Sequence, residues 1–375
     1  MHMIKVATPS RICLFGEHQD YLGLEVIASA INLHFSTKAV KRDDSLLKIK
    51  IRDSSIGELG ATNDEGKYEE VILDAAVEQV YEKPRDYFKS IVNVVKREGF
   101  AVPGADIIMD STIPIGKGMC SSTTMVMALT ATLVALCDPE AARDKRRMAY
   151  LAWKAEVQEF NEPGGMMDHY ASALGGLTHM DFRTGQCEAE PVELNMPGCY
   201  ILFDSLQDRD CTKVLAKAKF PTLDGIAALS KYGVTSIRDF YDHPELCEHL
   251  DEVDEFNRAR VIANINDYRL QREALELIRT GSMTDEKLGA MLNEHQANMR
   301  DGLGISTPAI DKILETAIAN GAYGGKFNGA GGGGCLYVYA PLDKADQICG
   351  AVKELGYPSM ILKKDDNGLT VTVEE

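Results

Sequence analysis

The sequence predicts a two-domain protein that mixes β-strands and α-helices. The chain has 375 residues, and because one hydrophobic core usually stops growing below that size, two domains are expected. The first 60 residues read as short strands, whereas long helical patterns and further strands follow. With 45% apolar and 26% charged residues and no biased tract, the chain is expected to fold nearly end to end.

The N-terminal part consists of apolar runs of strand length. β-Branched and aromatic residues are frequent in these runs, and turn-prone or polar residues separate them. The predicted strands are Ile4–Ala7, Ile12–Phe15, Val26–Leu33, Ser36–Val40 and Leu46–Ile51.

Helical spacing of apolar residues begins after residue 86. Tyr87–Arg97 is predicted as a helix, and Asp106–Asp110 as a strand. The strongest helical pattern covers Ser121–Leu136, and its first four residues carry hydroxyls that can cap exposed backbone N–H groups. Met148–Phe160 is predicted as a further helix.

The second half of the chain returns to mixed structure. Cys199–Phe203 reads as a strand, helices rich in Glu, Arg and Lys follow, and Ile310–Glu354 is predicted as a βαβ-like passage. The domain boundary is expected between Asp181 and Pro197, which gives domains of residues 1–190 and 191–375.

Composition excludes several classes of protein. A net charge of −17 disfavours nonspecific nucleic-acid binding, which needs Lys and Arg to neutralise phosphates. The apolar stretch around Met125–Cys137 is too short to span a membrane, and the N-terminus lacks a signal-peptide pattern, so we expect a cytoplasmic protein without membrane contact. Nine cysteines without a Cys-x-x-Cys pair predict reduced thiols.

A glycine-containing loop precedes the predicted helix at Ser121. Pro114–Thr123 places Gly116 and Gly118 just before that helix, as a phosphate-binding loop requires, because backbone must approach closely and free N–H groups must face the ligand. An ordinary loop and helix cap is the alternative. The spacing matches neither a Walker A loop nor a dinucleotide-binding fingerprint.

A second glycine cluster lies at Gly329–Cys335, before the apolar strand predicted at Leu336–Tyr339. Five glycines in six positions weaken local structure, so a need for close backbone approach is favoured over a tight structural crossing.

Two groups of polar side chains complete the candidate site. Glu17, His18 and Asp20 follow a strand, and could bind metal, perform acid–base chemistry or hold a polyol, unless they form a solvated turn. Glu156 and Asp168 lie twelve residues apart, and could converge with one holding Mg²⁺ and the other facing an acceptor hydroxyl, although either alone would usually be a surface acid.

In this order the four segments resemble the GHMP kinase superfamily. Pro9–Tyr21 and Ala155–Asp168 are similar to galactokinase motifs, whereas Glu294–Cys335 is more similar to mevalonate kinase. The resemblance implies an α+β fold of two domains. The N-terminal one would be like ribosomal protein S5 domain 2, the C-terminal one would be ferredoxin-like, and the active site would lie between them.

The resemblance also implies roles for individual residues, with ATP as co-substrate and Mg²⁺ as cofactor. Asp168 would act on the acceptor hydroxyl, and Arg11 would keep it ionised and stabilise the transferring phosphoryl group. Ser122 and Glu156 would hold Mg²⁺, with Ser121 as the alternative ligand. Glu17, His18 and Asp20 would bind substrate hydroxyls. ATP phosphates would lie against Gly116, Lys117, Gly118, Met119, Cys120, Ser121, Ser122, Gly331 and Gly332.

Three polar side chains suit several neighbouring hydroxyls, so we expect a sugar kinase that forms a sugar 1-phosphate. We expect the protein to be a monomer or a homodimer. Lys117 and Cys120 depart from the family loop, and Asp204–Cys211 departs from galactokinase. Arg209 or Lys213 could therefore pair with a substrate carboxylate. A uronic acid, arabinose, an amino sugar, a cyclitol or mevalonate remain alternatives, as does a sugar sensor without activity.

Overall fold

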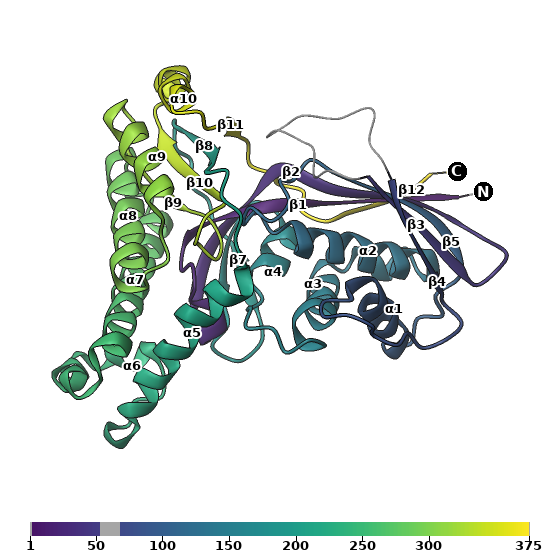
Figure 1. The fold of residues 1–375 in the computed structure, drawn as a ribbon, viewed down its shortest axis with the longest axis horizontal. Coiled ribbons are helices and arrows are strands. Elements are labelled where there is room, and N and C mark those ends of the chain that lie inside the picture. The colour runs from purple at the N-terminus through teal and green to yellow at the C-terminus, as the bar shows by residue number, and fades with distance from the viewer. Residues whose placement is uncertain (1, 53–67, 375) are drawn as a thin grey trace.

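The computed structural model describes residues 2–52 and 68–374. Their strands form an eight-stranded sheet and a four-stranded sheet, with the smaller one at the left of Figure 1. The larger sheet has the order β12-β1-β2-β5-β3-β4, and β6 and β7 extend it beside β2. Its strands are β1 (Met3–Phe15), β2 (Glu25–Lys41), β3 (Leu46–Arg52), β4 (Tyr68–Asp74), β5 (Ala105–Ser111), β6 (Leu177–Asp181), β7 (Glu188–Pro191) and β12 (Thr370–Glu374).

Strands β1 and β2 are longer than the sequence pattern indicates, because each joins two of the predicted strands. Their pairing shifts register between Pro9 and Ser10 and again between Cys13 and Phe15. Such irregularities let a strand continue past residues that would otherwise end it. As a result β1 runs from the outer edge of the molecule to the loop that carries Glu17.

Four helices cover one face of the larger sheet, namely α1 (Tyr87–Arg97), α2 (Ser121–Cys137), α3 (Lys145–Trp153) and α4 (Met167–Leu174) (Figure 1). Helix α2 is buried almost all round, as expected for a helix whose sequence contains no charged residue. The predicted bounds of α1 are confirmed. The single helix predicted at Met148–Phe160 is wrong in its bounds, because α3 begins at Lys145 and then widens into the π-helical turn η3 (Lys154–Gln158).

The smaller sheet is antiparallel, with the order β11-β8-β10-β9. It comprises β8 (Cys199–Asp204), β9 (Gly324–Phe327), β10 (Cys335–Ala340) and β11 (Ser359–Leu362), with α9 (Pro308–Ala319) before β9 and α10 (Ala345–Glu354) after β10. This is the βαββαβ connectivity of a ferredoxin-like domain, as expected. The predicted βαβ-like passage is wrong, because the glycine cluster turns β9 directly into the antiparallel strand β10.

Four further helices lie between β8 and α9 in the chain, and α7 and α8 run along the left edge of Figure 1. They are α5 (Cys211–Ala228), α6 (Ile237–Asp242), α7 (Glu255–Arg279) and α8 (Asp285–Ala297). Helix α7 packs on α5, α6 and α8, and it also contacts β1 and β2. The loop after β1 is thereby backed by helix.

The last strand of the chain, β12, pairs with the first strand, β1, and places Glu374 opposite Met3. The last residues of the predicted second domain thus lie in the larger sheet, and the division at residue 190 stays a prediction.

The largest core cluster fills the space between the larger sheet and α1–α4, and a second lies between the smaller sheet, α9 and α10. No helix among the described residues is long and apolar enough to cross a membrane.

Candidate active site

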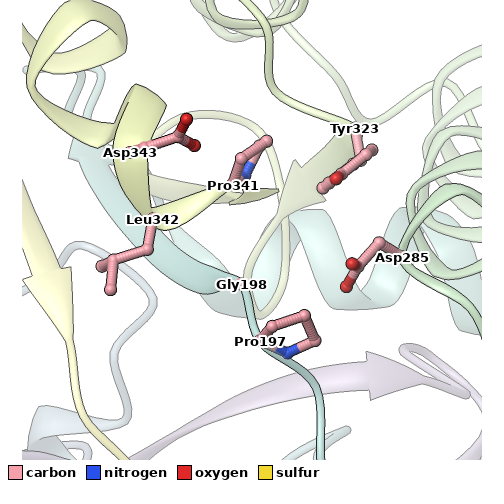
Figure 2. A pocket seen from close by; sticks show the side chains of 7 residues that line it. All are labelled: Pro197, Gly198, Asp285, Tyr323, Pro341, Leu342 and Asp343. Atoms are coloured by element: carbon pink, nitrogen blue, oxygen red, sulfur yellow. The ribbon is translucent and has the colours of Figure 1, made fainter.

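A pocket of ≈ 440 Å³ lies at one end of the smaller sheet, where β8 and β9 begin and β10 ends (Figure 2). It is lined by Pro197, Gly198, Asp285, Tyr323, Pro341, Leu342 and Asp343. None of these residues belongs to a motif that predicts phosphate or sugar binding, so this pocket is not the candidate active site.

A cavity of ≈ 840 Å³ collects most of the predicted site residues. Its wall is built from β1, the loop after β1, the N-termini of α2 and α4, the turn η3 and the start of α5. The predicted residues that line it are Arg11, Glu17, His18, Asp20, Gly116, Gly118, Cys120, Ser121, Ser122, Glu156 and Asp168. Segments more than 150 residues apart in the chain therefore meet at one site.

Four residues predicted for phosphate binding do not line this cavity: Lys117, Met119, Gly331 and Gly332. Lys117 instead donates from Nζ to Asp208, 3.0 Å away, and Met119 is fully buried. From the second glycine cluster it is Gly329 and Ala330 that reach the cavity wall. The phosphate contacts of all four stay predictions.

The N-terminus of α2 is open toward the cavity. Cys120 occupies the N-cap in a left-handed conformation (φ 46°), and no side chain caps the helix. Thr124 donates its hydroxyl back to the carbonyls of Cys120 and Ser121, so the predicted hydroxyl capping is wrong. The N–H groups of the first turn are left for another acceptor, and a helix N-terminus in this state attracts phosphate.

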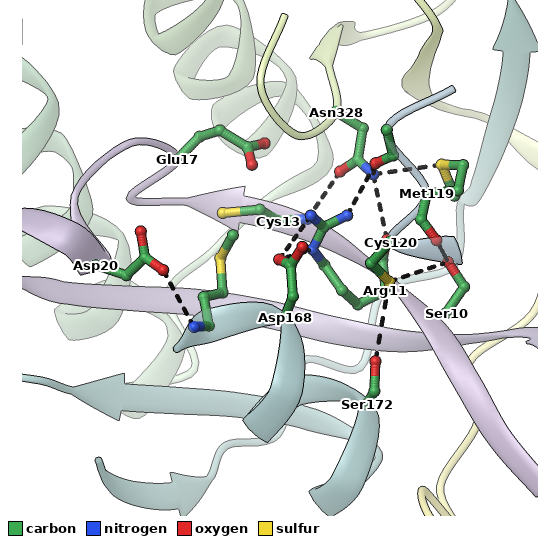
Figure 3. Close-up of polar contacts among 12 residues, drawn as sticks. Ser10, Arg11, Cys13, Glu17, Asp20, Met119, Cys120, Asp168, Ser172 and Asn328 are labelled. Carbon is green, nitrogen blue, oxygen red and sulfur yellow. Dashed lines mark hydrogen bonds and ion pairs between the residues drawn. The ribbon is translucent and has the colours of Figure 1, made fainter. Parts of the chain in front are cut away.

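Arg11 and Asp168, which both line the cavity, form an ion pair (Figure 3). Arg11 donates from Nε to Oδ1 of Asp168 at 2.7 Å, and its Nη1 donates to the Gly118 carbonyl at 3.1 Å. Burial opposes the charge of Arg11, but the Asp168 carboxylate, together with Cys120, Glu17 and Cys13, outweighs burial and raises the pKa of Arg11. The guanidinium thus connects the predicted catalytic carboxylate to the glycine loop.

Asn328 holds the same loop from the other domain (Figure 3). Its Nδ2 donates to the carbonyls of Arg11 and Gly118, and its Oδ1 accepts from the backbone of Cys13. The side chain is completely buried. Sequence reasoning missed its role, and its only signal was the position one residue before the second glycine cluster.

Glu17, which lines the cavity, is paired with a buried lysine. Oε2 of Glu17 lies 2.7 Å from Nζ of Lys326, and their side chains are 2% and 0% exposed. Lys326 also donates to the carbonyls of Cys13 and Phe327. Burial raises the pKa of the Glu17 carboxyl, but the charges of Lys326 and Arg11 and the hydrogen bond from Lys326 together outweigh burial, and the net shift is downward. Glu17 is therefore charged and firmly held at the cavity wall.

His18 and Asp20 lie beside Glu17. Nδ1 of His18 is 2.8 Å from the Tyr21 hydroxyl, and burial lowers the pKa of His18 to about 4, so the ring is neutral at pH 7. Asp20 accepts a hydrogen bond from the backbone of Met167 at 3.1 Å, and burial raises its pKa to about 6. A side chain at Gly165 would place its Cβ 2.0 Å from Oδ2 of Asp20, which explains the glycine.

Glu156 lies in η3, and π-helical turns are frequent at functional sites. Burial raises its pKa, but the neighbouring His169 and the hydroxyls of Ser122 and Thr123 outweigh burial and lower it. A charged carboxylate beside hydroxyls at a helix N-terminus is an oxygen donor set that fits Mg²⁺. Among the described residues, no group of three or more His, Cys, Asp and Glu side chains is arranged to hold a metal ion.

The two basic residues considered for a substrate carboxylate differ in their surroundings. Arg209 donates from Nη1 to the carbonyls of Gly331 and Gly333, while its buried Nε and Nη2 have no partner among the described residues. Lys213 is 85% exposed and pairs with Asp210. Arg209 lines the cavity, whereas Lys213 does not.

Two family models match the two halves of this site. The GHMP kinases N terminal domain matches residues 86–176, which include the glycine loop, Glu156 and Asp168. The GHMP kinases C terminal model matches residues 274–358, which include Lys326, Asn328 and the second glycine cluster. The chain belongs to the GHMP kinases.

Both mevalonate kinases and galactokinases are among the proteins similar to this chain. The chain is 28% identical to a mevalonate kinase of Pyrococcus abyssi, with 98% of each chain covered. It is 27% identical to a galactokinase of Glaesserella parasuis, with 92% of this chain and 86% of that one covered. The structure of Lactococcus lactis galactokinase complexed with galactose aligns with a TM-score of 0.79 at 22% identity, covering 99% of this chain and 95% of that one. The predicted two-domain GHMP kinase fold is confirmed.

Proposed function

We propose that this GHMP kinase transfers the γ-phosphate of ATP to the anomeric hydroxyl of a neutral monosaccharide and releases a sugar 1-phosphate. The observation that carries the proposal is the ion pair of Arg11 and Asp168, which lies between the open N-terminus of α2 and Asp20 in one cavity. One end of the cavity suits phosphates, and the other suits hydroxyls.

Each chemical task has a side chain in place. The N–H groups at the start of α2 hold ATP phosphates, and Asp168 accepts or orients the proton of the acceptor hydroxyl. Arg11 keeps Asp168 ionised and positioned. Ser122 and Glu156 would hold Mg²⁺, which neutralises charge on the phosphates. Asp20 and His18 bind hydroxyls of the sugar, while Glu17 is fixed by Lys326.

Charge around Asp20 favours a neutral substrate. Asp20 forms no ion pair with any residue that the structure describes, so a substrate carboxylate placed against it would meet an anion, which costs binding energy for mevalonate or a uronic acid. Of the three arginines that line the cavity, Arg11 pairs with Asp168 and Arg85 with Glu162. Arg209 has no carboxylate partner among the described residues, and its buried Nε and Nη2 are unpartnered. Its Nη2 lies against the glycine loop, where a Cβ at Gly118 would be 2.0 Å away, so this cation belongs to the end of the cavity that suits phosphates.

Mevalonate is the second candidate, because the identity to the mevalonate kinase of Pyrococcus abyssi equals that to galactokinase within one percentage point. ATP consumption should be measured with Mg²⁺ and galactose, arabinose, N-acetylgalactosamine, galacturonate, glucuronate, myo-inositol or mevalonate. Turnover of a neutral sugar supports the proposal. Turnover of mevalonate alone, or ATP binding without turnover of any of these, contradicts it and favours the second candidate or a sensor.

A further inference from the structure

His169 is a buried residue that lines the cavity and has no role in the proposed phosphoryl transfer. It follows Asp168 in the first turn of α4, lines the cavity and is 2% exposed. Neither of its ring nitrogens has a hydrogen-bond partner among the described residues. Buried imidazoles are normally hydrogen-bonded, so an unpartnered one beside a reaction site calls for a role.

The imidazole lies against the Glu156 carboxylate. Its Nε2 is 2.9 Å from Oε2 of Glu156, although the ring is not aligned for a straight hydrogen bond. This Oε2 is itself closed off from solvent and has no other partner. The contact is therefore a close electrostatic one that covers one of the two carboxylate oxygens.

A carboxylate covered on one oxygen has one oxygen left to face a cation. Glu156 reaches the cavity beside the hydroxyls of Ser122 and Thr123, which favour its charged form. A group that fixes the inner oxygen prevents the carboxylate from rotating away, so a cation meets a preorganised ligand. Partners of this kind around metal ligands commonly contribute 10–100-fold to metal affinity.

We propose that His169 is a positioning residue, which holds Glu156 so that its outer oxygen is presented to the divalent cation. The inference rests on the proposed function, because it takes Glu156 as a cation ligand. His169 itself touches neither phosphate nor sugar. Its imidazole acts only through Glu156, and a side chain that brings a polar N–H group to the position of Nε2 should replace it.

The chain offers a matched control in His179. This histidine is also buried, and its Nδ1 lies 3.2 Å from Oε1 of Glu190. The pair joins β6 to β7 and does not line the cavity. The variant His179→Leu therefore removes a buried histidine next to a glutamate and leaves the proposed cation site unchanged.

The test measures Mn²⁺ binding by electron paramagnetic resonance in the presence of ADP, where no turnover occurs. His169→Leu should weaken Mn²⁺ binding about tenfold or more. His169→Gln, which keeps an amide donor of similar reach, should stay near the wild type, and so should His179→Leu. In kinetics the Leu variant should raise the apparent KM for Mg²⁺ more than the KM for sugar. His169→Asn, whose amide is too short, replaces the Leu variant if that protein does not fold.

The variant Glu156→Gln distinguishes failure of the role of His169 from failure of the proposed cation site. If it weakens Mn²⁺ binding while His169→Leu binds as the wild type does, Glu156 is a ligand and the role of His169 is overturned. Equal losses in the Leu and Gln variants of His169 also overturn it, because packing rather than the donor would then matter. Unchanged binding in Glu156→Gln overturns the cation assignment within the proposed function.

Discussion

Arg11 stands behind Asp168 rather than beside it. The two form an ion pair of 2.6 Å, yet the Arg11 side chain is 3% exposed and that of Asp168 is 28% exposed. The carboxylate therefore faces the cavity, while the guanidinium is enclosed between it and the Gly118 carbonyl. An acceptor hydroxyl in the cavity would meet Asp168 first.

Asp168→Asn should lower kcat by orders of magnitude and leave nucleotide binding nearly unchanged. The amide keeps the size of the side chain but cannot accept the hydroxyl proton, and it faces the acceptor side of the cavity. Steady-state kinetics and ATP-analogue titration by calorimetry provide the two readouts. Turnover equal to that of the wild type would remove Asp168 from the catalytic role.

Gly165→Ala should raise the KM for sugar about tenfold or more, whereas the neighbouring Gly164→Ala should leave it nearly unchanged. A Cβ at Gly165 would lie 2.0 Å from Oδ2 of Asp20, but at Gly164 the nearest atom is 3.7 Å away, on Val157. Displacing a charged hydroxyl acceptor removes a hydrogen bond that contributes roughly 1.5–3 kcal/mol. The KM for ATP is the internal control, and equal effects of both substitutions on sugar binding would refute the role of Asp20.

Sugar binding should weaken as the pH falls below about 6. Burial raises the pKa of Asp20 from 3.8 to about 6, so its carboxylate loses its charge in that range and accepts hydrogen bonds less strongly. The KM for sugar, measured between pH 5 and 8, should follow this titration, and Asp20→Asn should flatten it.

The same pKa has a consequence for stability. Because the folded-state pKa of Asp20 is raised, its contribution to the free energy of unfolding is fully present below pH 3.8 and is lost as the pH rises through about 6. Asp20→Asn should therefore increase stability relative to the wild type above pH 6 and not at pH 4. A melting temperature that falls in this variant at pH 8 would contradict the shift.

Lys326→Met should destabilise the fold by about 3–5 kcal/mol at pH 7, because it leaves the Glu17 carboxylate buried without its partner. Adding Glu17→Gln should recover part of that loss. The pKa of Glu17 is lowered below its ordinary 4.5, so the contribution of the pair is present above pH 4.5 and is lost as the pH falls through the folded pKa. Chemical denaturation at pH 7 and pH 4 measures both effects, and an additive double variant would show that the two side chains are not coupled.

Most of the candidate site residues could be predicted to lie together because each stands in a short local pattern. The glycines before α2 and the acids after β1 lie within a few residues of a predicted helix or strand, which indicates their local structure. The structure brings them to one cavity. Asn328 and Lys326 could not be assigned roles in this way. Their partners, Arg11 and Glu17, are more than 300 residues away in the chain, and nothing local to either residue specifies that contact.

The fold shows the same limit. Apolar spacing predicted α1 to the residue, because one face of that helix is buried and the pattern is local. It could not predict that β12 pairs with β1, nor that the glycine cluster turns β9 back as a hairpin. Both depend on pairing between strands, which sequence spacing alone does not encode.

Phosphorus NMR of the product tests the proposed reaction most directly. The protein is incubated with ATP, Mg²⁺ and a neutral sugar that it consumes, and the new phosphate signal is examined for coupling to sugar protons. We expect a signal coupled to the anomeric proton, formed by the wild type and missing with Asp168→Asn. A phosphate on another carbon would contradict the assignment of this GHMP kinase as an anomeric sugar kinase.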